Sequence, residues 1–178
     1  MAPSPLFSGL HCASFFGIVE LVIVFVNVEG YEVDQQDCTG KTPLARAAKN
    51  GHEGVVKILL QQENVNPDHP DINNLTPLAW AAIEGHERVV KLLLEQENVD
   101  PDRPDKNDIT PLGWATIKGH EGIVKLLLGR RDVDSNRLDK RHNTPLSYAI
   151  IKGHKSIIQL LQAQKSVETP DAQLPHQM

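Results

Sequence analysis

The apolar and polar positions of this chain recur with a period of 34 residues. The segment TPLARAAKNGH begins at Thr42, and close copies of it begin at Thr76, Thr110 and Thr144. A fixed period of this length is typical of a solenoid, in which each repeat buries its apolar face only by stacking on its neighbours. The pattern therefore predicts a stacked array of small units.

Each unit is expected to contain two short helices. Thr42 is a favourable N-cap, Pro43 suits the first helical position, and Gly51 is a typical helix stop. Apolar residues return at helical spacing from about Glu53. Helices this short are marginal in water alone, so neighbouring repeats must hold them.

The connection between repeats is rich in Asn, Asp and Pro, which predicts an extended turn. Two of its registers hold only residue types that tolerate a left-handed backbone. They are Gly30, Asn64, Asn98 and Asp132 in one, and Gly40, Asn74, Asp108 and His142 in the other. Both registers therefore indicate backbone geometry and not side-chain chemistry.

Shifting the pattern back by one period reaches Ser8, where a degenerate first repeat begins. The expected organisation is an N-terminal extension at 1–7, repeats at 8–41, 42–75, 76–109 and 110–143, a C-terminal cap at 144–163, and a disordered tail at 164–178. The tail is expected to be disordered because it lacks the apolar period and contains two prolines.

The TPLxxA stretch, the GH that follows it, the VVKLLL helix and the Asp that opens each turn together resemble the ankyrin repeat family, over residues 8 to about 163. The resemblance implies an all-α solenoid of about five helix-turn-helix repeats, linked by extended β-turn or hairpin-like loops. The repeat is one residue longer than the usual length of about 33. The family usually has His after TPL, where this chain has Ala45, Ala79, Gly113 and Ser147 and only His11 matches.

Composition narrows the functional classes. Hydrophobic residues make up 40% and charged residues 23%, which is close to globular usage. The net charge of −5 gives no general attraction to nucleic acid or acidic membranes. Two cysteines, Cys12 and Cys38, are too few for a disulfide scaffold, so we expect a reducing, intracellular location in the cytoplasm or nucleus.

Residues 15–28 form the most apolar stretch of the chain. The stretch is too short to span a membrane, and Glu20 interrupts it. A signal peptide needs basic residues before its apolar segment, and no Lys or Arg precedes Lys41. We interpret it as a buried helix of the array. Apolar residues also replace polar ones here, with Ile23 in the place of a Lys, so we expect a patch that self-associates or packs on an upstream domain.

Catalytic and metal sites are not indicated. Equivalent residues of neighbouring repeats lie about 8–10 Å apart, whereas zinc needs each ligand at about 2 Å. The histidines that recur once per repeat, His52, His86, His120 and His154, are therefore interpreted as caps of the inter-helix turn. The chain has no glycine-rich phosphate loop, nucleophile elbow or HExxH motif, so we predict no enzyme activity, cofactor, metal or small-molecule substrate.

Aromatic residues occupy one register at Trp80, Trp114 and Tyr148, where the preceding repeat has Arg46. We expect them to form a packing stripe between repeats, the alternative being an exposed aromatic groove for a peptide. Arg46 is expected to stack on Trp80.

In the family, partners commonly contact the turn tips and the inward end of the first helix. The resemblance therefore implies a protein-binding surface at Lys41, Lys49, Ile72, Leu75, Ile83, Lys106, Ile109, Ile117, Lys118, Lys140, Arg141, Ile151 and Lys152. Seven of these residues are basic. In the registers that hold them, the only acidic residue is Glu84, which is not among them. The predicted residues suit an acidic, partly apolar protein partner, although Lys at helix C-termini is also favoured by the helix dipole.

The predicted function is binding of another protein through the concave face. The alternative is a regulatory or targeting segment of a larger enzyme or NTPase whose catalytic domain is absent here. Nucleic-acid binding is a weaker interpretation, because the chain is acidic overall and its aromatic residues do not alternate with the cations.

Overall fold

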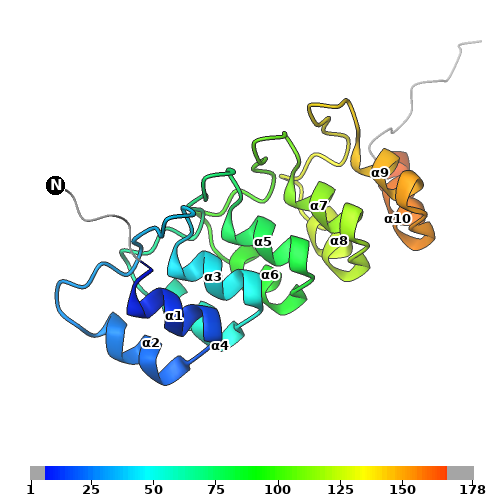
Figure 1. Ribbon diagram of the computed structural model, residues 1–178. Coiled ribbons are helices and arrows are strands. Elements are labelled where there is room, and N and C mark those ends of the chain that lie inside the picture. Colours follow the sequence, from blue (N-terminus) through cyan, green and yellow to red (C-terminus); the bar gives the residue numbers. More distant parts are fainter. Residues whose placement is uncertain (1–6, 168–178) are drawn as a thin grey trace, which may run out of the picture.

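The computed structural model describes residues 7–167, which form ten helices and no strand. The helices pair into five helix-turn-helix units that stack side by side (Figure 1). The first helices of the pairs are α1 (Gly9–Phe16), α3 (Pro43–Asn50), α5 (Pro77–Glu84), α7 (Pro111–Lys118) and α9 (Pro145–Lys152). The second helices are α2 (Val19–Val26), α4 (Glu53–Leu60), α6 (Glu87–Leu94), α8 (Glu121–Leu128) and α10 (Lys155–Val167).

The helix ends follow from single residues, as the sequence predicts. Thr76 Oγ1 accepts a hydrogen bond from the backbone N–H of Ala79 at 3.1 Å, Pro77 is the first residue of α5, and Gly85 ends that helix at φ 87°. The same Thr, Pro and Gly arrangement bounds α3, α7 and α9. Local chemistry therefore sets where the first helices begin and end.

The core lies between the two rows of helices and runs through all five pairs. Leu44, Leu78 and Leu112 of the first helices are almost completely buried, as are Leu59 and Leu93 of the second. Each first helix packs on the next first helix, and each second helix packs on the next second helix. Because most of these helices have eight residues, contact with neighbouring repeats supplies the stability that they lack alone.

An aspartate closes the hairpin turn at the end of each connection. Asp71 Oδ1 accepts hydrogen bonds from the N–H groups of Asn73 at 2.8 Å and Leu75 at 3.1 Å, while the N–H of Asp71 donates to the Leu75 carbonyl. Asn74 has a left-handed φ of 62°. Gly40, Asp108 and His142 are also left-handed, so the predicted backbone role of this register is confirmed.

The register that follows the second helix, which contains Gly30, Asn64, Asn98 and Asp132, is not left-handed throughout. Gly30 has a positive φ, but Asn64, Asn98 and Asp132 do not, so the left-handed prediction is wrong for these three. The chain turns there through a hydrogen bond from the N–H of Val65 to the carbonyl of Gln62. A four-residue turn of this kind can close with negative φ throughout.

The two ends of the chain differ from the expectations. Val22 of α2 is buried, but most other apolar residues of 15–28 are exposed, so the buried-helix interpretation is wrong and the expected apolar patch is present. The last helix continues to Val167, past the expected end of the cap at residue 163. The rest of the predicted tail, 168–178, lies outside the described residues. No helix of the described part is both long and apolar enough to cross a membrane.

Candidate protein-binding surface

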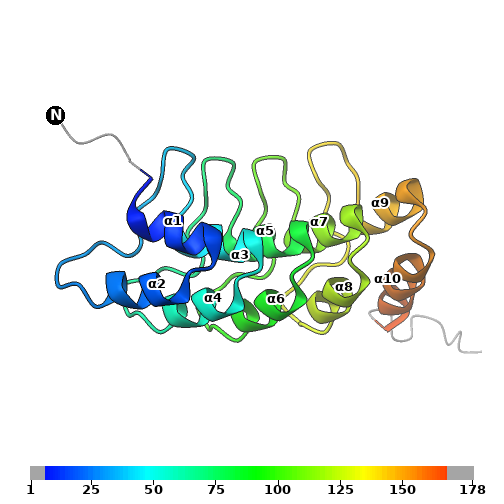
Figure 2. The ribbon, with the colours of Figure 1, turned by 60° about the horizontal axis from the view of Figure 1, so that its bottom comes forward.

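Four hairpins project side by side along one edge of the array, with turns at 37–41, 71–75, 105–109 and 139–143, here called the first to fourth hairpins (Figure 2). Backbone hydrogen bonds join their tips. The N–H of Lys106 donates to the Asn73 carbonyl at 2.9 Å, and the N–H of Lys140 donates to the Asn107 carbonyl at 3.0 Å. These bonds hold equivalent side chains of successive hairpins in a row.

The predicted binding residues divide by exposure. The exposed ones are Ile72, Lys106, Lys118, Lys140, Arg141, Ile151 and Lys152. The partly buried ones are Lys49, Ile83, Ile109 and Ile117. Lys41 and Leu75 are buried.

Lys41 and Leu75 therefore have to be removed from the predicted surface. They occupy the same position in the first and second hairpins. The ammonium of Lys41 lies 3.1 Å from Asp71 Oδ2 and 4.6 Å from the centre of the Trp80 ring, both in the next repeat. In these two hairpins the side chain is buried, so a partner cannot reach it.

Three of the four hairpin aspartates also accept a hydrogen bond from the side chain nine residues later, whereas the buried Nε1 of Trp114, which follows the third hairpin, has no hydrogen-bond partner among the described residues. Arg46 Nε donates to Asp37 Oδ2 at 2.8 Å, and Trp80 Nε1 donates to Asp71 Oδ2 at 3.1 Å. Tyr148 donates its hydroxyl hydrogen to Asp139. Our sequence interpretation missed this pairing, although the signal is present as an Asp and a hydrogen-bond donor nine residues apart in register.

The expected stack of Arg46 on Trp80 is wrong. Arg46 is held in an ion pair with Asp37, and its guanidinium lies 5.1 Å from the centre of the Phe7 ring. The Trp80 ring instead contacts the ammonium groups of Lys41 and Lys49, the latter at 4.2 Å. Trp80 therefore serves as a packing residue, as the stripe interpretation predicts.

A groove of about 240 Å³ lies between the third and fourth hairpins. Its lining residues are Asn107, Ile109, Trp114, Asp139, Lys140, Arg141 and Tyr148. The structure thus brings three predicted residues, Ile109, Lys140 and Arg141, beside two half-buried aromatic rings. At Trp114 and Tyr148 the aromatic register forms a groove, which was the alternative interpretation of the sequence.

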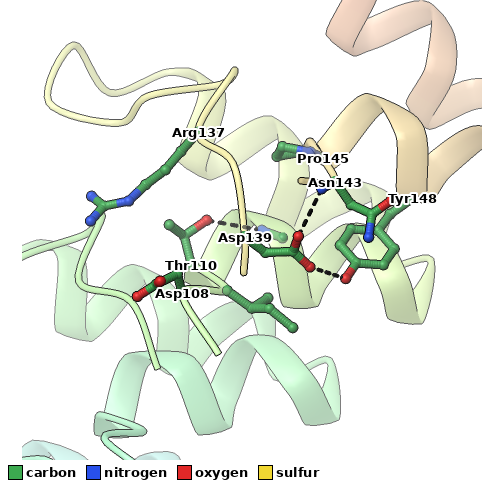
Figure 3. A pocket seen from close by; sticks show the side chains of 9 residues that line it. Asp108, Thr110, Arg137, Asp139, Asn143, Pro145 and Tyr148 are labelled. Carbon is green, nitrogen blue, oxygen red and sulfur yellow. Dashed lines mark hydrogen bonds between the residues drawn. The ribbon is translucent and has the colours of Figure 1, made fainter. Parts of the chain in front are cut away.

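Asp139 forms part of the groove wall and of a small adjoining pocket of about 10 Å³. Figure 3 shows its carboxylate between the backbone of Asn143 and the hydroxyl of Tyr148. Burial raises the pKa of Asp139, but hydrogen bonds from Tyr148, Asn143 and Arg141 outweigh it, so the pKa falls below its usual value. Burial and the nearby Asp139 raise the pKa of Tyr148, which therefore keeps its proton and remains a donor.

A second set of ion pairs ties each connection to the next. Arg103 Nη1 lies 2.8 Å from Asp68 Oδ2, and Arg137 Nη1 lies 3.0 Å from Asp102 Oδ2. One repeat earlier, His69 occupies the register of these arginines, and its Nδ1 lies 2.9 Å from Asp34 Oδ2. Burial raises the pKa of Asp68 and Asp102, and the arginine contacts offset part of that rise. We assign these pairs a structural role, because they join the bases of the connections and not the hairpin tips.

The recurring histidines connect neighbouring repeats. His86 Nε2 donates to the carbonyl of Lys49 at 3.0 Å, and His120 Nε2 donates to the carbonyl of Ile83 at 3.0 Å. Lys49 and Ile83 lie in the last turns of α3 and α5, so each ring caps the end of the first helix in the preceding pair, and neither ring forms a capping hydrogen bond with its own helix. Among the described residues no group of three or more His, Cys, Asp and Glu is arranged to hold a metal ion.

Acid is expected to weaken the first hairpin. Burial raises the pKa of Asp37, but hydrogen bonds from Thr39 and Arg46 outweigh this and lower it to about 2. A carboxyl with a lowered pKa stabilises the fold above its unfolded value near 3.8, and that contribution disappears as the pH falls towards 2. At neutral pH, Asp37 should therefore contribute about 2 kcal/mol relative to Asp37→Asn.

The measurement is urea unfolding of both proteins from neutral pH down to about pH 2. Other carboxylates titrate in both proteins and cancel in the difference. The stability difference should narrow below about pH 4, and a constant difference down to pH 2 would contradict the assignment.

Comparison with known proteins gives one family match. A family model described as ankyrin repeats (3 copies) matches residues 10–105 and 96–171. No curated protein matches the chain. The two matched ranges together contain all five helix pairs apart from the first residue of α1.

Proposed function

Because the chain belongs to the ankyrin repeat family, whose members generally mediate protein–protein interactions, we propose that it binds an acidic, partly apolar segment of another protein. The proposed site is the groove between the third and fourth hairpins, together with the exposed hairpin tips beside it. The fold is typically non-catalytic, and this function requires no bound cofactor.

The observation that carries the proposal is the placement of Lys140 and Arg141 beside Trp114 and Tyr148 in one groove. Aromatic rings and arginine side chains supply much of the affinity in protein interfaces. Cations at the rim orient an acidic partner and increase the rate of association. The carboxylate of Asp139 lies in the same groove, but both of its oxygens already accept hydrogen bonds, from the backbone N–H groups of Arg141 and Asn143 and from the hydroxyl of Tyr148.

The cations on the hairpins support a binding role more strongly than the cations on the helices. Lys118 and Lys152 lie in the last turns of α7 and α9, where the helix dipole favours a cation without any partner. Lys106, Lys140 and Arg141 lie on hairpins, where that explanation does not apply. Their exposure beside the groove therefore supports a binding role.

A random peptide library displayed on phage provides the probe. Peptides enriched on the immobilised chain should combine Asp or Glu with aliphatic or aromatic residues. Synthetic copies of the enriched peptides should bind Lys140→Glu, Arg141→Glu at least about tenfold more weakly than wild type, measured by fluorescence anisotropy.

The control variant has the same change of charge on the second helices of the pairs, away from the hairpins. Lys57 and Lys91 are exposed on α4 and α6, so Lys57→Glu, Lys91→Glu should bind the peptides with nearly unchanged affinity. Both double variants should keep the wild-type circular dichroism, since exposed substitutions usually change stability within about 0.5 kcal/mol. Equal weakening in the two variants, or enrichment of peptides without acidic residues, would reject the groove as the site.

A further inference from the structure

The outer side of the first repeat resembles an interface that lacks its partner. Leu21 of α2 is 45% exposed, whereas Val55, Val89 and Ile123 at the same register are 0% exposed. Each of these later residues has a described repeat before it, and Leu21 does not. The register is therefore buried in the later repeats, each of which follows another described repeat, and it is exposed in the first.

The same comparison extends to the next turn of the helix. Val24 is 59% exposed, while Ile58 and Leu92 at its register are partly buried against the core. Leu21 and Val24 lie three residues apart on one side of α2, and Val28, just beyond the end of the helix, is also exposed. The exposed apolar side chains of residues 15–28 are here called the N-terminal face.

The N-terminal face is more apolar than stacking within the array requires. Phe16 is 67% exposed and stands where the later repeats have Asn, Glu, Lys and Lys. Ile23 is also exposed and stands where the next three repeats have Lys. Water would favour polar residues at these positions, as in the other repeats, so their apolar character indicates that a partner covers them.

A further repeat of this array would not fit that face well. Every later repeat holds its predecessor through a histidine that donates to a carbonyl of the preceding first helix, as His52 does to Phe15 at 2.9 Å. Ile18 occupies the histidine register in the first repeat and has no hydrogen-bonding side chain. A preceding repeat would therefore lack the bond that joins all the others.

From these observations we infer that two copies of the chain associate through their N-terminal faces. An apolar face with a single carboxylate, Glu20, within its span meets a matching surface on a second copy, and a twofold dimer uses the same patch on both subunits. In the later pairs the register of Leu21 is buried within the array, in which each second helix packs on the preceding second helix, so the face is equivalent to a surface that already packs one helix pair against another.

The available area suits a dimer of moderate strength. Seven large apolar side chains of the face are each between 37% and 67% exposed. Together they leave on the order of 600 Å² uncovered, below the roughly 800 Å² per partner of a standard interface. Phe16 and Ile23 lie at registers that are exposed in most of the later repeats, so they stand at the edge of the face and contribute only part of their area to it. We therefore expect dissociation at micromolar concentration.

Sedimentation velocity from about 1 to about 100 µM tests the inference, since the expected dissociation constant lies within that range. The wild-type chain should shift from monomer to dimer as its concentration rises. Leu21→Glu, Val24→Glu should remain monomeric, with unchanged circular dichroism. The control Ile72→Glu, Ile151→Glu removes two exposed apolar side chains elsewhere and should dimerise like wild type.

A last variant separates a head-to-head dimer from head-to-tail stacking. Ile150 is 58% exposed on α9, at the register where Thr116 is buried against the next repeat. Head-to-tail stacking would place the N-terminal face on this end, and Ile150→Glu would then abolish association. The inferred dimer should be unaffected by Ile150→Glu. Loss of association in that variant, or a wild-type chain that stays monomeric at the highest concentration, would overturn the inference.

Discussion

Replacing Asp71 with alanine is expected to lower the free energy of unfolding by about 3–5 kcal/mol. The buried carboxylate of Asp71 accepts hydrogen bonds from two backbone N–H groups of its own turn and from the indole of Trp80. It also lies 3.1 Å from the ammonium of Lys41, whose side chain is only 9% exposed. Removing the carboxylate would leave that ammonium buried without a counter-charge, which is the costly part of the change.

Asp105→Ala is the control that loses the turn hydrogen bonds alone, because within the described part of the chain Asp105 has neither the ion pair of Asp71 nor its bond from an indole. Asp105 closes the third hairpin through the N–H groups of Asn107 and Ile109, as Asp71 closes the second. The register of Lys41 is occupied there by Leu75, and no ion pair to Asp105 occurs among the described residues. Its loss should cost about 1–3 kcal/mol, the usual range for abandoned hydrogen bonds.

Urea unfolding followed by circular dichroism measures both losses. Lys41→Leu in the Asp71→Ala background should recover part of the stability, because it removes the unpaired charge and reproduces the residue of the next repeat. Equal losses in the two single variants, without recovery in the double variant, would show that the ion pair does not matter.

Gly85→Ala is expected to cost about 2–5 kcal/mol, from a strained backbone and a steric clash together. Gly85 has φ 87°, a conformation that residues with a β carbon rarely adopt. An added β carbon would lie 2.6 Å from Cε1 of His120. That ring cannot move away freely, because its Nε2 donates to the Ile83 carbonyl in the preceding repeat.

Gly153→Ala separates the two contributions. Gly153 has a similar φ of 74°, but no heavy atom lies within 4 Å of the position of an added β carbon. Its substitution should cost only the backbone strain, about 1–2 kcal/mol. The difference between the two variants in urea unfolding therefore measures the contact between repeats. A difference near zero would mean that the histidine adjusts without loss.

Local sequence is sufficient to predict the repeat, its two helices and the backbone of its hairpin turns. Thr76, Pro77 and Gly85 bound their helix as predicted, and Asn74 adopts the predicted left-handed conformation. These features depend on a residue and its neighbours within a few positions along the chain. A strict period of 34 residues then repeats the same local solution.

Tertiary structure decided which predicted residues are accessible and what the recurring side chains contact. Lys41 was expected on the surface but pairs with Asp71 in the next repeat, and the predicted capping by His86 acts on Lys49 at the end of the first helix in the preceding repeat. The same aromatic register packs at Trp80 and forms a groove wall at Tyr148. Each outcome depends on a side chain or backbone group of a neighbouring repeat, about 30 or more residues away in sequence, and the local pattern around a residue does not specify that contact.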